Sequence, residues 1–268
     1  MPASLCETVL SPAETEAFHR DGYHIARGLF TPNEVWALTD HFMRLHATRA
    51  LKHYPFHGWE EAQGDILKVY TRVMQPHRWD DLSLKMLLEP RVAEMLRALL
   101  NEEPIATQSM FYYKPPGSKG QTFHQDNYYL RVRPHSCIAS WLALDRSDLE
   151  NGGLQVVPGT HTMEIACPQK ADPKYNFSQD YVPPPPGMTP IPAILEPGDV
   201  LFFNGSLLHG STPNESKTRW RRSYICHYAP ASCHEVSKGY FPLLDMNGNV
   251  VQREAAIGGG PCGGADKM

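Results

Sequence analysis

No apolar run in this sequence approaches the length that a membrane-spanning helix needs. Crossing a bilayer takes roughly 20 consecutive apolar residues, and the 268-residue chain contains no such stretch. The first residues, MPASLCETVLSPAE, carry acidic side chains and no basic region, unlike a secretory signal peptide. The sequence therefore predicts a soluble, cytoplasmic protein that does not enter a membrane.

Cysteine pairs and an excess of one charge are also missing. The six cysteines form no CxxC pair and no regular framework, so in a chain this long we expect reduced thiols. They are Cys6, Cys137, Cys167, Cys226, Cys233 and Cys262. The net charge is only -4, which gives no field that would attract nucleic acid. Phosphate-binding loops and serine or cysteine nucleophile motifs are absent too. These absences favour a small-molecule substrate and leave the oligomeric state open.

Two capping boxes with proline at the first helical position predict helices near the N-terminus. They are Ser11-Pro12-Ala13-Glu14 and Thr31-Pro32-Asn33-Glu34, and GYHIARGLF between them alternates like a short strand. A third helix is predicted from Pro90 to about Leu100, where apolar residues recur at helical spacing. The segment 46–65 has no clear period, and we interpret it as an irregular surface loop.

From residue 105 the pattern changes to short β-prone runs separated by turn signals. The runs TQSMFYY, SCIASWLALD, GLQVVPG, AILEPGDVLFF and RSYICHYAP favour a sandwich or barrel, and a jelly roll satisfies their number. Residues 168–190, with four consecutive prolines, and the glycine-rich C-terminal end should be irregular. We expect a mainly β fold with flanking helices in one domain over 1–268. Its helical part should cover about 1–104, its β core about 105–230 and its tail 231–268.

Three residues carry the strongest indication of chemistry. His124 and Asp126 stand two positions apart, which on a strand places both side chains on one face. His209 follows in LLHGS, on what the pattern predicts to be another strand of the same sheet system. Two imidazoles and one carboxylate on one face of an octahedral ion leave three positions open, as in non-heme Fe(II) oxygenases. The other histidines lack such spacing, and we interpret them as non-ligands; they include His135, His161, His227 and His234.

Several motifs in a fixed order give the chain a resemblance to a known family. LSPAETEAFHRDGYHIARGLF, HQD, NGGLQVVPGTH, PGDVLFFNGSLLHGS and RRSYICHY extend over most of residues 10–230. On these residues the chain resembles the phytanoyl-CoA dioxygenase family of Fe(II)- and 2-oxoglutarate-dependent oxygenases. The resemblance implies a double-stranded β-helix, with His124, Asp126 and His209 as metal ligands. It also implies Fe(II), 2-oxoglutarate and O2 as cofactor and cosubstrates, and hydroxylation of an unactivated C–H bond with release of succinate and CO2. Related halogenases lack the carboxylate, so Asp126 favours hydroxylation.

The same resemblance implies a pocket for 2-oxoglutarate. The family places an arginine about eleven residues after the distal histidine, and a planar guanidinium binds a carboxylate through two parallel hydrogen bonds. Here Arg221 stands at plus twelve, and Arg219 in the same basic run is the alternative. The other positions that match the cosubstrate pocket of the family are Lys68, Met110, Trp141 and Ser211.

The same donors would also hold manganese, cobalt or zinc, so the sequence does not fix the metal by itself. Two other classes of protein also stay open. One is a non-catalytic jelly-roll protein that keeps a metal for stability or sensing, although such a protein has no need of an anion pocket. The other is a cupin-like hydrolase or isomerase that uses a divalent metal as a Lewis acid. The second class predicts activity without O2 or 2-oxoglutarate.

The residues after the HxD motif are the candidates for the substrate site. If the strand continues past Asp126, then Asn127, Tyr129 and Arg131 share one face. Polar and cationic groups beside the metal favour a small polar, anionic or zwitterionic metabolite over a long acyl chain. The run HQDNYYLRV is also similar to bacterial hydroxylases of the family that act on aminoalkylphosphonates, which makes an aminoalkylphosphonate a specific candidate.

Overall fold

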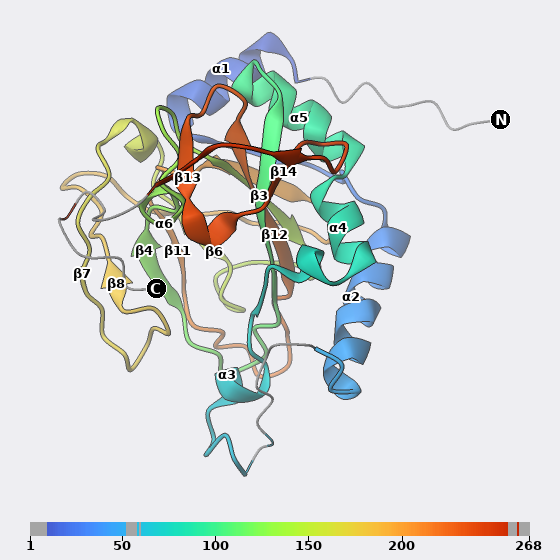
Figure 1. Ribbon diagram of the computed structural model, residues 1–268. Helices are drawn as coiled ribbons and strands as arrows, with labels where there is room; N and C mark the ends of the chain where they lie inside the picture. Colours follow the sequence, from blue (N-terminus) through green and yellow to red (C-terminus); the bar gives the residue numbers. More distant parts are fainter. Residues whose placement is uncertain (1–9, 52–57, 59, 257–261, 263–268) are drawn as a thin grey trace.

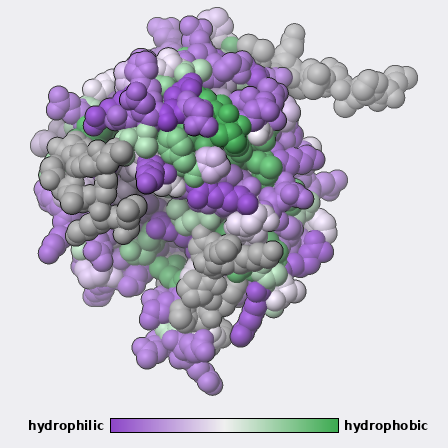
Figure 2. Space-filling model, viewed as in Figure 1, coloured by the Kyte–Doolittle hydropathy of each residue, from purple (hydrophilic) through white to green (hydrophobic). Residues whose placement is uncertain are grey.

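The structure of the protein is a computed structural model that describes residues 10–51, 58, 60–256 and 262. Two main β-sheets form its centre, and helices cover the outer side of the larger sheet (Figure 1). Hydrophilic side chains prevail on the face shown in Figure 2. In the described part of the chain, no helix combines the length and the apolar character needed to cross a membrane.

Local sequence signals explain the helices. The predicted capping boxes are present in α1 (Pro12–Asp21) and α2 (Pro32–Ala47), where Ser11 and Thr31 accept hydrogen bonds from the backbone of Glu14 and Glu34. The predicted third helix is α5 (Pro90–Leu100). Shorter elements are α3 (Ile66–Val69), α4 (Asp81–Leu87), α6 (Asn127–Leu130), η1 (Pro76–Arg78), η2 (Thr160–Thr162) and η3 (Lys238–Tyr240).

The larger sheet has eight strands and the smaller has four. The larger is ordered β1 (Tyr23–Ala26), β10 (Val200–Asn204), β5 (Ile138–Ala143), β12 (Ser223–Pro230), β3 (Pro104–Tyr112), β14 (Leu243–Leu244) and β15 (Val250–Val251), with β2 (Val73–Met74) paired to β3. The smaller is ordered β4 (Gln121–His124), β11 (His209–Ser211), β6 (Leu154–Val156) and β9 (Ile191–Pro192). This arrangement confirms the prediction of a mainly β jelly roll with flanking helices.

Strand β12 is buried on both faces, and its residues alternate between them. Tyr224 and Tyr228 point toward the helices, and their hydroxyls each donate a hydrogen bond of 2.8 Å, to the carbonyls of Ser83 and Leu87 in α4. Ile225 points the other way and packs in the apolar cluster between the two sheets. One strand therefore connects the helical layer to the space between the sheets.

Four expectations from the sequence need correction or fall partly outside the described residues. Cys167 and Cys262 form a disulfide although we expected reduced thiols, because the fold brings together two residues 95 positions apart with a Cα–Cα distance of 5.6 Å.

Residues 168–190 are not wholly irregular, since β7 (Gln169–Lys170) pairs with β8 (Asp180–Tyr181). The first two residues of the predicted loop 46–65 belong to α2, while 52–57 and 59 lie outside the described residues. Within the predicted tail, β13 (Glu235–Ser237) pairs with β16 (Glu254–Ala256), and of the glycine-rich end beyond residue 256 only 262 is described.

Candidate metal centre and cosubstrate pocket

The structure brings His124, Asp126 and His209 together in the space between the two sheets. His124 on β4 and His209 on β11 are direct partners in the antiparallel ladder, and their ring centroids are 4.3 Å apart. The Asp126 carboxylate lies 3.4 Å from Nε2 of His124 and 3.6 Å from Nε2 of His209. One atom from each residue falls within 4.8 Å of the other two. The predicted strand geometry was wrong in one respect: β4 ends at His124, and Asp126 has a helical backbone just before α6.

Hydrogen bonds to the backbone fix the tautomers of both imidazoles. Nδ1 of His124 lies 2.8 Å from the carbonyl oxygen of Thr122, and Nδ1 of His209 lies 3.0 Å from that of Leu207. Because a carbonyl can only accept, each Nδ1 carries the proton and each Nε2 keeps its lone pair. Two imidazole lone pairs and a carboxylate thus converge without a proton between them. That donor set fits a divalent metal such as Fe(II).

The electrostatics of the site keep its donors in the forms that bind metal. Burial lowers the pKa of His209 to about 4, so this imidazole is neutral at neutral pH. Burial alone would raise the pKa of Asp126, but the neighbouring His209 and His227 outweigh it and hold that pKa well below its ordinary value. A neutral imidazole and an ionised carboxylate are the states that a metal requires.

His227 is the residue of this centre that the sequence analysis missed. It lies on the inner face of β12, and its Nε2 is 2.8 Å from Oδ2 of Asp126. An ionised carboxylate can only accept, so Nε2 of His227 donates. Its Nδ1 is buried and has no hydrogen-bond partner among the described residues. The signal that could have found it is its alternation with the inward-facing Ile225 in the run ICHY. His227 thus orients the carboxylate ligand rather than joining the ligand set.

We expect His227→Phe to weaken metal binding, because Asp126 loses the donor that holds Oδ2. Losing such an orienting partner typically costs about 10–100-fold in metal affinity. His227→Gln keeps an amide donor and should recover part of the loss. Anaerobic titration of each variant with Fe(II) measures the effect, and His234→Phe, at an exposed histidine, is the control. Equal affinities in wild type and His227→Phe would show that the hydrogen bond does not orient the ligand.

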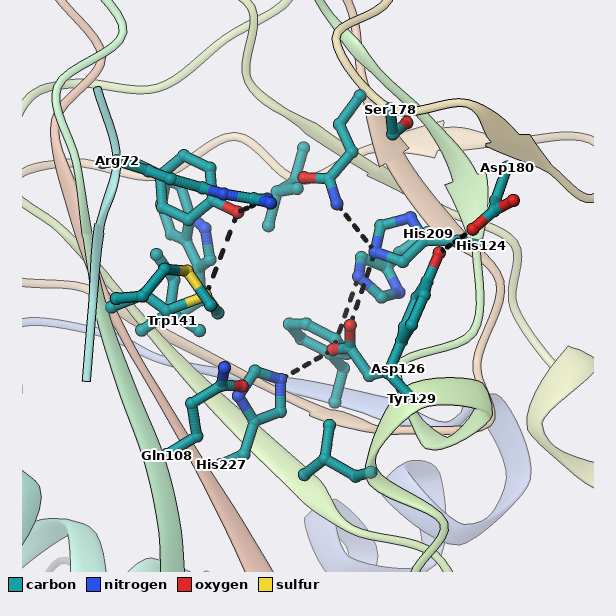
Figure 3. A pocket seen from close by; sticks show the side chains of 18 of the residues that line it. Arg72, Gln108, His124, Asp126, Tyr129, Trp141, Ser178, Asp180, His209 and His227 are labelled. Atoms are coloured by element: carbon teal, nitrogen blue, oxygen red, sulfur yellow. Dashed lines mark hydrogen bonds and ion pairs between the residues drawn. The ribbon is translucent and has the colours of Figure 1, made fainter. Parts of the chain in front are cut away.

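The three residues lie in the wall of a cavity of about 340 Å³ (Figure 3). Met110 and Trp141, both predicted for the cosubstrate pocket, line this cavity together with Arg221. Ser211 does not line it but follows His209 by two residues on β11. Lys68 does not line it either, since it is exposed on α3.

Arg221 is a buried cation without a carboxylate partner among the described residues. Its Nε donates to the carbonyl of Gly152 and its Nη1 to the hydroxyl of Ser223, both at 3.0 Å. Its Cζ lies 5.3 Å from the centroid of the Trp141 ring. Burial lowers its pKa to about 10, so it stays charged at neutral pH. Because a buried charge is costly unless it is paired, this position suits an anionic ligand.

The alternative, Arg219, is already paired. Its guanidinium binds both carboxylate oxygens of Asp148, at 2.9 and 2.7 Å, and Glu150 at 2.6 Å. These ion pairs lie near the surface, where about a third of the Arg219 side chain is exposed. The geometry therefore favours Arg221 over Arg219 as the arginine available to a cosubstrate.

Of the three predicted substrate residues, only some lie in the cavity wall. The strand that we expected after Asp126 is the short helix α6, so the alternation argument was wrong. Tyr129 lines the cavity and donates to Oδ2 of Asp180 at 2.9 Å. Asn127 and Arg131 do not line it. Asn127 instead exchanges hydrogen bonds of 2.9 and 3.2 Å with the backbone of Val132 and so holds the end of α6.

Arg72 and Asp180 are charged cavity residues that the sequence did not indicate. They lie on opposite sides of the cavity, with Asp180 on the same side as Tyr129 and the metal-site histidines (Figure 3). Arg72 donates to the hydroxyl of Tyr112 at 3.1 Å. The cavity thus presents a positive group on one wall and a negative group on the other.

Fold and site define a jelly-roll protein with a two-histidine, one-carboxylate facial triad beside a buried arginine. Comparison with protein families matches residues 18–223 to the phytanoyl-CoA dioxygenase family. The chain belongs to this family of Fe(II)- and 2-oxoglutarate-dependent oxygenases, whose metal and cosubstrate are those that the donor set and the buried arginine fit.

A curated relative agrees with this family. The peroxisomal phytanoyl-CoA dioxygenase of Bos taurus is 30% identical over 180 residues, which cover 63% of this chain and 52% of the relative. The chain thus matches about half the length of that relative.

Two solved structures with the same fold contain ligands of this chemistry. EctD from S. alaskensis, with 2-oxoglutarate and 5-hydroxyectoine, has a TM-score of 0.67 at 22% identity, covering 85% of this chain and 78% of its own. CytC3 with Fe(II) and alpha-ketoglutarate has a TM-score of 0.59 at 23% identity, covering 90% and 81%. Other neighbours are described as a carbocyclase and an epimerase, so the fold alone does not define the reaction.

Proposed function

We propose that the protein is an Fe(II)- and 2-oxoglutarate-dependent dioxygenase that hydroxylates a C–H bond of a small polar metabolite, anionic or zwitterionic, with an aminoalkylphosphonate as a specific candidate. The observation that carries this proposal is the facial triad beside Arg221, a buried cation with no carboxylate partner among the described residues. A metal held only for stability does not require an anion site next to it. A hydrolase that uses its metal as a Lewis acid does not require an anion site for a dicarboxylate.

The residues of the chain have distinct roles in this reaction. His124, Asp126 and His209 would hold Fe(II), which when bound supplies O2 activation coupled to the oxidative decarboxylation of 2-oxoglutarate. Arg221 would bind the distal carboxylate of the cosubstrate. Asp126 leaves no place on the metal for a halide, which favours hydroxylation over halogenation.

The size and charge of the cavity support a small, charged substrate. A volume of about 340 Å³ is at the lower end of the usual range for small-molecule sites, and the cosubstrate must share it. Arg72 can bind an anionic group, while Asp180 and Tyr129 on the opposite wall can bind an ammonium group (Figure 3). A zwitterion held by both walls would have its two charged ends fixed inside the cavity that also contains the metal ligands. Fixed placement of this kind is the main contribution of a protein to such chemistry.

A screen for substrate-stimulated succinate formation tests the proposal. We expect aminoalkylphosphonates or other small zwitterions to raise succinate above the uncoupled background, and alkylphosphonates without the amine to raise it less. No stimulation should occur without O2. Turnover of a substrate in the absence of O2 and 2-oxoglutarate would instead support the Lewis-acid alternative.

Asp180→Asn should then raise KM for the zwitterion by roughly tenfold, which corresponds to about 1.4 kcal/mol. The amine-free analogue should be unaffected, because it has no group for Asp180 to bind. Asp172→Asn, at an exposed aspartate of the same segment that is outside the cavity wall, is the matched control. An equal change in KM for both substrates would show that Asp180 does not bind the ammonium group.

A further inference from the structure

A second buried basic side chain, Lys114, lies close to Arg221. It follows β3 directly, and its side chain is buried. Its Nζ donates to the hydroxyl of Ser211 at 2.9 Å and to the carbonyl of Thr212 at 2.7 Å. A Cβ built on Gly152 would come within 2.7 Å of this Nζ, and the carbonyl of Gly152 accepts from Arg221. Both basic side chains therefore lie beside the same glycine.

The contacts of Lys114 determine the direction of the Ser211 hydrogen bond. A hydroxyl oxygen has two lone pairs and one proton. Here Nζ of Lys114 donates to the oxygen at 2.9 Å and the backbone N–H of Gln121 donates to it at 3.3 Å. Both lone pairs are thus engaged, and the proton has no acceptor in the part of the chain that the structure describes. Ser211 can act on a ligand only as a donor, which is the role that a carboxylate needs.

Neither Lys114 nor Arg221 is directly paired with an acidic side chain in the described part of the chain. No carboxylate among the described residues forms a hydrogen bond or ion pair with Lys114 or Arg221. Burial, and then the charge of Arg221, hold the pKa of Lys114 well below its usual range. The interior thus disfavours the charged form of Lys114, and a bound anion would favour that form while it offsets the cost of burying the charge of Arg221.

We propose that Lys114 is a positioning residue for the distal carboxylate of 2-oxoglutarate. Once the bound carboxylate favours the protonated form of Lys114, the ammonium can only donate to Ser211, which leaves the Ser211 proton for the carboxylate, and it adds a second positive charge beside Arg221. This inference rests on the proposed role of Arg221 and on the role of Ser211 that the family resemblance implies. It also gives the second cation of the cosubstrate pocket a position different from the exposed Lys68. Its consequence is selectivity for a dicarboxylate over a monocarboxylate of the same length.

The test compares 2-oxoglutarate with 2-oxopentanoate, in which a methyl group replaces the distal carboxylate. Each ligand is titrated anaerobically into the Fe(II)-loaded protein by calorimetry. For Lys114→Met we expect the Kd of 2-oxoglutarate to rise at least tenfold and that of 2-oxopentanoate to change less than threefold. Lys114→Gln keeps a donor to Ser211 without the charge, and its Kd for 2-oxoglutarate should lie between those of wild type and Lys114→Met. Lys119→Met, at a nearby lysine whose Nζ contacts only the carbonyl of Pro173 among the described residues, is the matched control.

Thermal melting supplies a second readout that does not depend on turnover. The increase in Tm on adding 2-oxoglutarate should be smaller in Lys114→Met than in wild type, and unchanged in Lys119→Met. If Lys114→Met does not fold, Lys114→Gln carries both comparisons. Equal weakening for the two ligands would mean that Lys114 only supports the local fold, and it would overturn the inference. Failure of the wild type to prefer 2-oxoglutarate over 2-oxopentanoate would instead refute the proposed cosubstrate.

Discussion

His209→Ala should fold normally but lose both tight Fe(II) binding and 2-oxoglutarate turnover. The substitution removes one of the three metal donors that converge in the cavity within the described part of the chain. Losing a group that merely orients a ligand already costs about 10–100-fold in affinity, so losing a ligand should cost more. We expect the same result for His124→Ala and Asp126→Ala.

Anaerobic Fe(II) titration and succinate release measure the two losses, while circular dichroism confirms the fold. His161→Ala is the control, because this histidine lies in η2 and its Nε2 contacts the carbonyl of His19 instead of the cavity. Asp126→Gly is a separate case, since it could retain iron while losing hydroxylation. Wild-type turnover in any of the three alanine variants would refute the ligand assignment.

Arg221→Ala should raise the requirement for 2-oxoglutarate strongly. Removing one partner of a buried charged pair costs about 2–5 kcal/mol, which corresponds to roughly 30-fold to several thousandfold in Kd. Arg221→Lys should recover only part of the affinity, because lysine restores the charge without the planar pair of donors. Binding of 2-oxoglutarate to the Fe(II)-loaded protein, measured under anaerobic conditions, gives the effect directly.

Arg219→Ala is the matched control for this experiment. Its ion pairs with Asp148 and Glu150 lie near the surface, where such pairs contribute about 0–1 kcal/mol to stability. We therefore expect near-normal cosubstrate binding in that variant. A large loss in Arg219→Ala together with none in Arg221→Ala would reverse the assignment.

The sequence predicted those features that depend on short-range signals. The capping boxes at Ser11 and Thr31 define helix starts by contacts within four residues, and α1 and α2 begin there. The HxD motif and the distal histidine identified a triad that the β4–β11 ladder brings together. Turn signals and alternating runs likewise indicated a jelly roll before its strand order was known.

Features that depend on contacts between distant segments could not be predicted in this way. His227 meets Asp126 only because β12 lies opposite the end of β4, and the two residues are 101 positions apart. Arg72 lies in the segment between α3 and β2 and Asp180 begins β8, so the two residues reach one cavity from parts of the chain with no shared motif. The turn of α6 after Asp126 was missed because alternating side chains suggested a continued strand, whereas the chain forms a short helix there.

Because the side chains of β12 alternate between its two faces, substitutions at even-numbered and odd-numbered positions should have different effects. Even positions such as 224 and 228 anchor the strand to α4 through the tyrosine hydroxyls, so changes there should act on stability. Odd positions 225 and 227 line the cavity, so changes there should act on substrate choice and on the metal. A mutant library restricted to odd positions of this strand can therefore vary catalysis while it leaves the anchorage of the sheet intact.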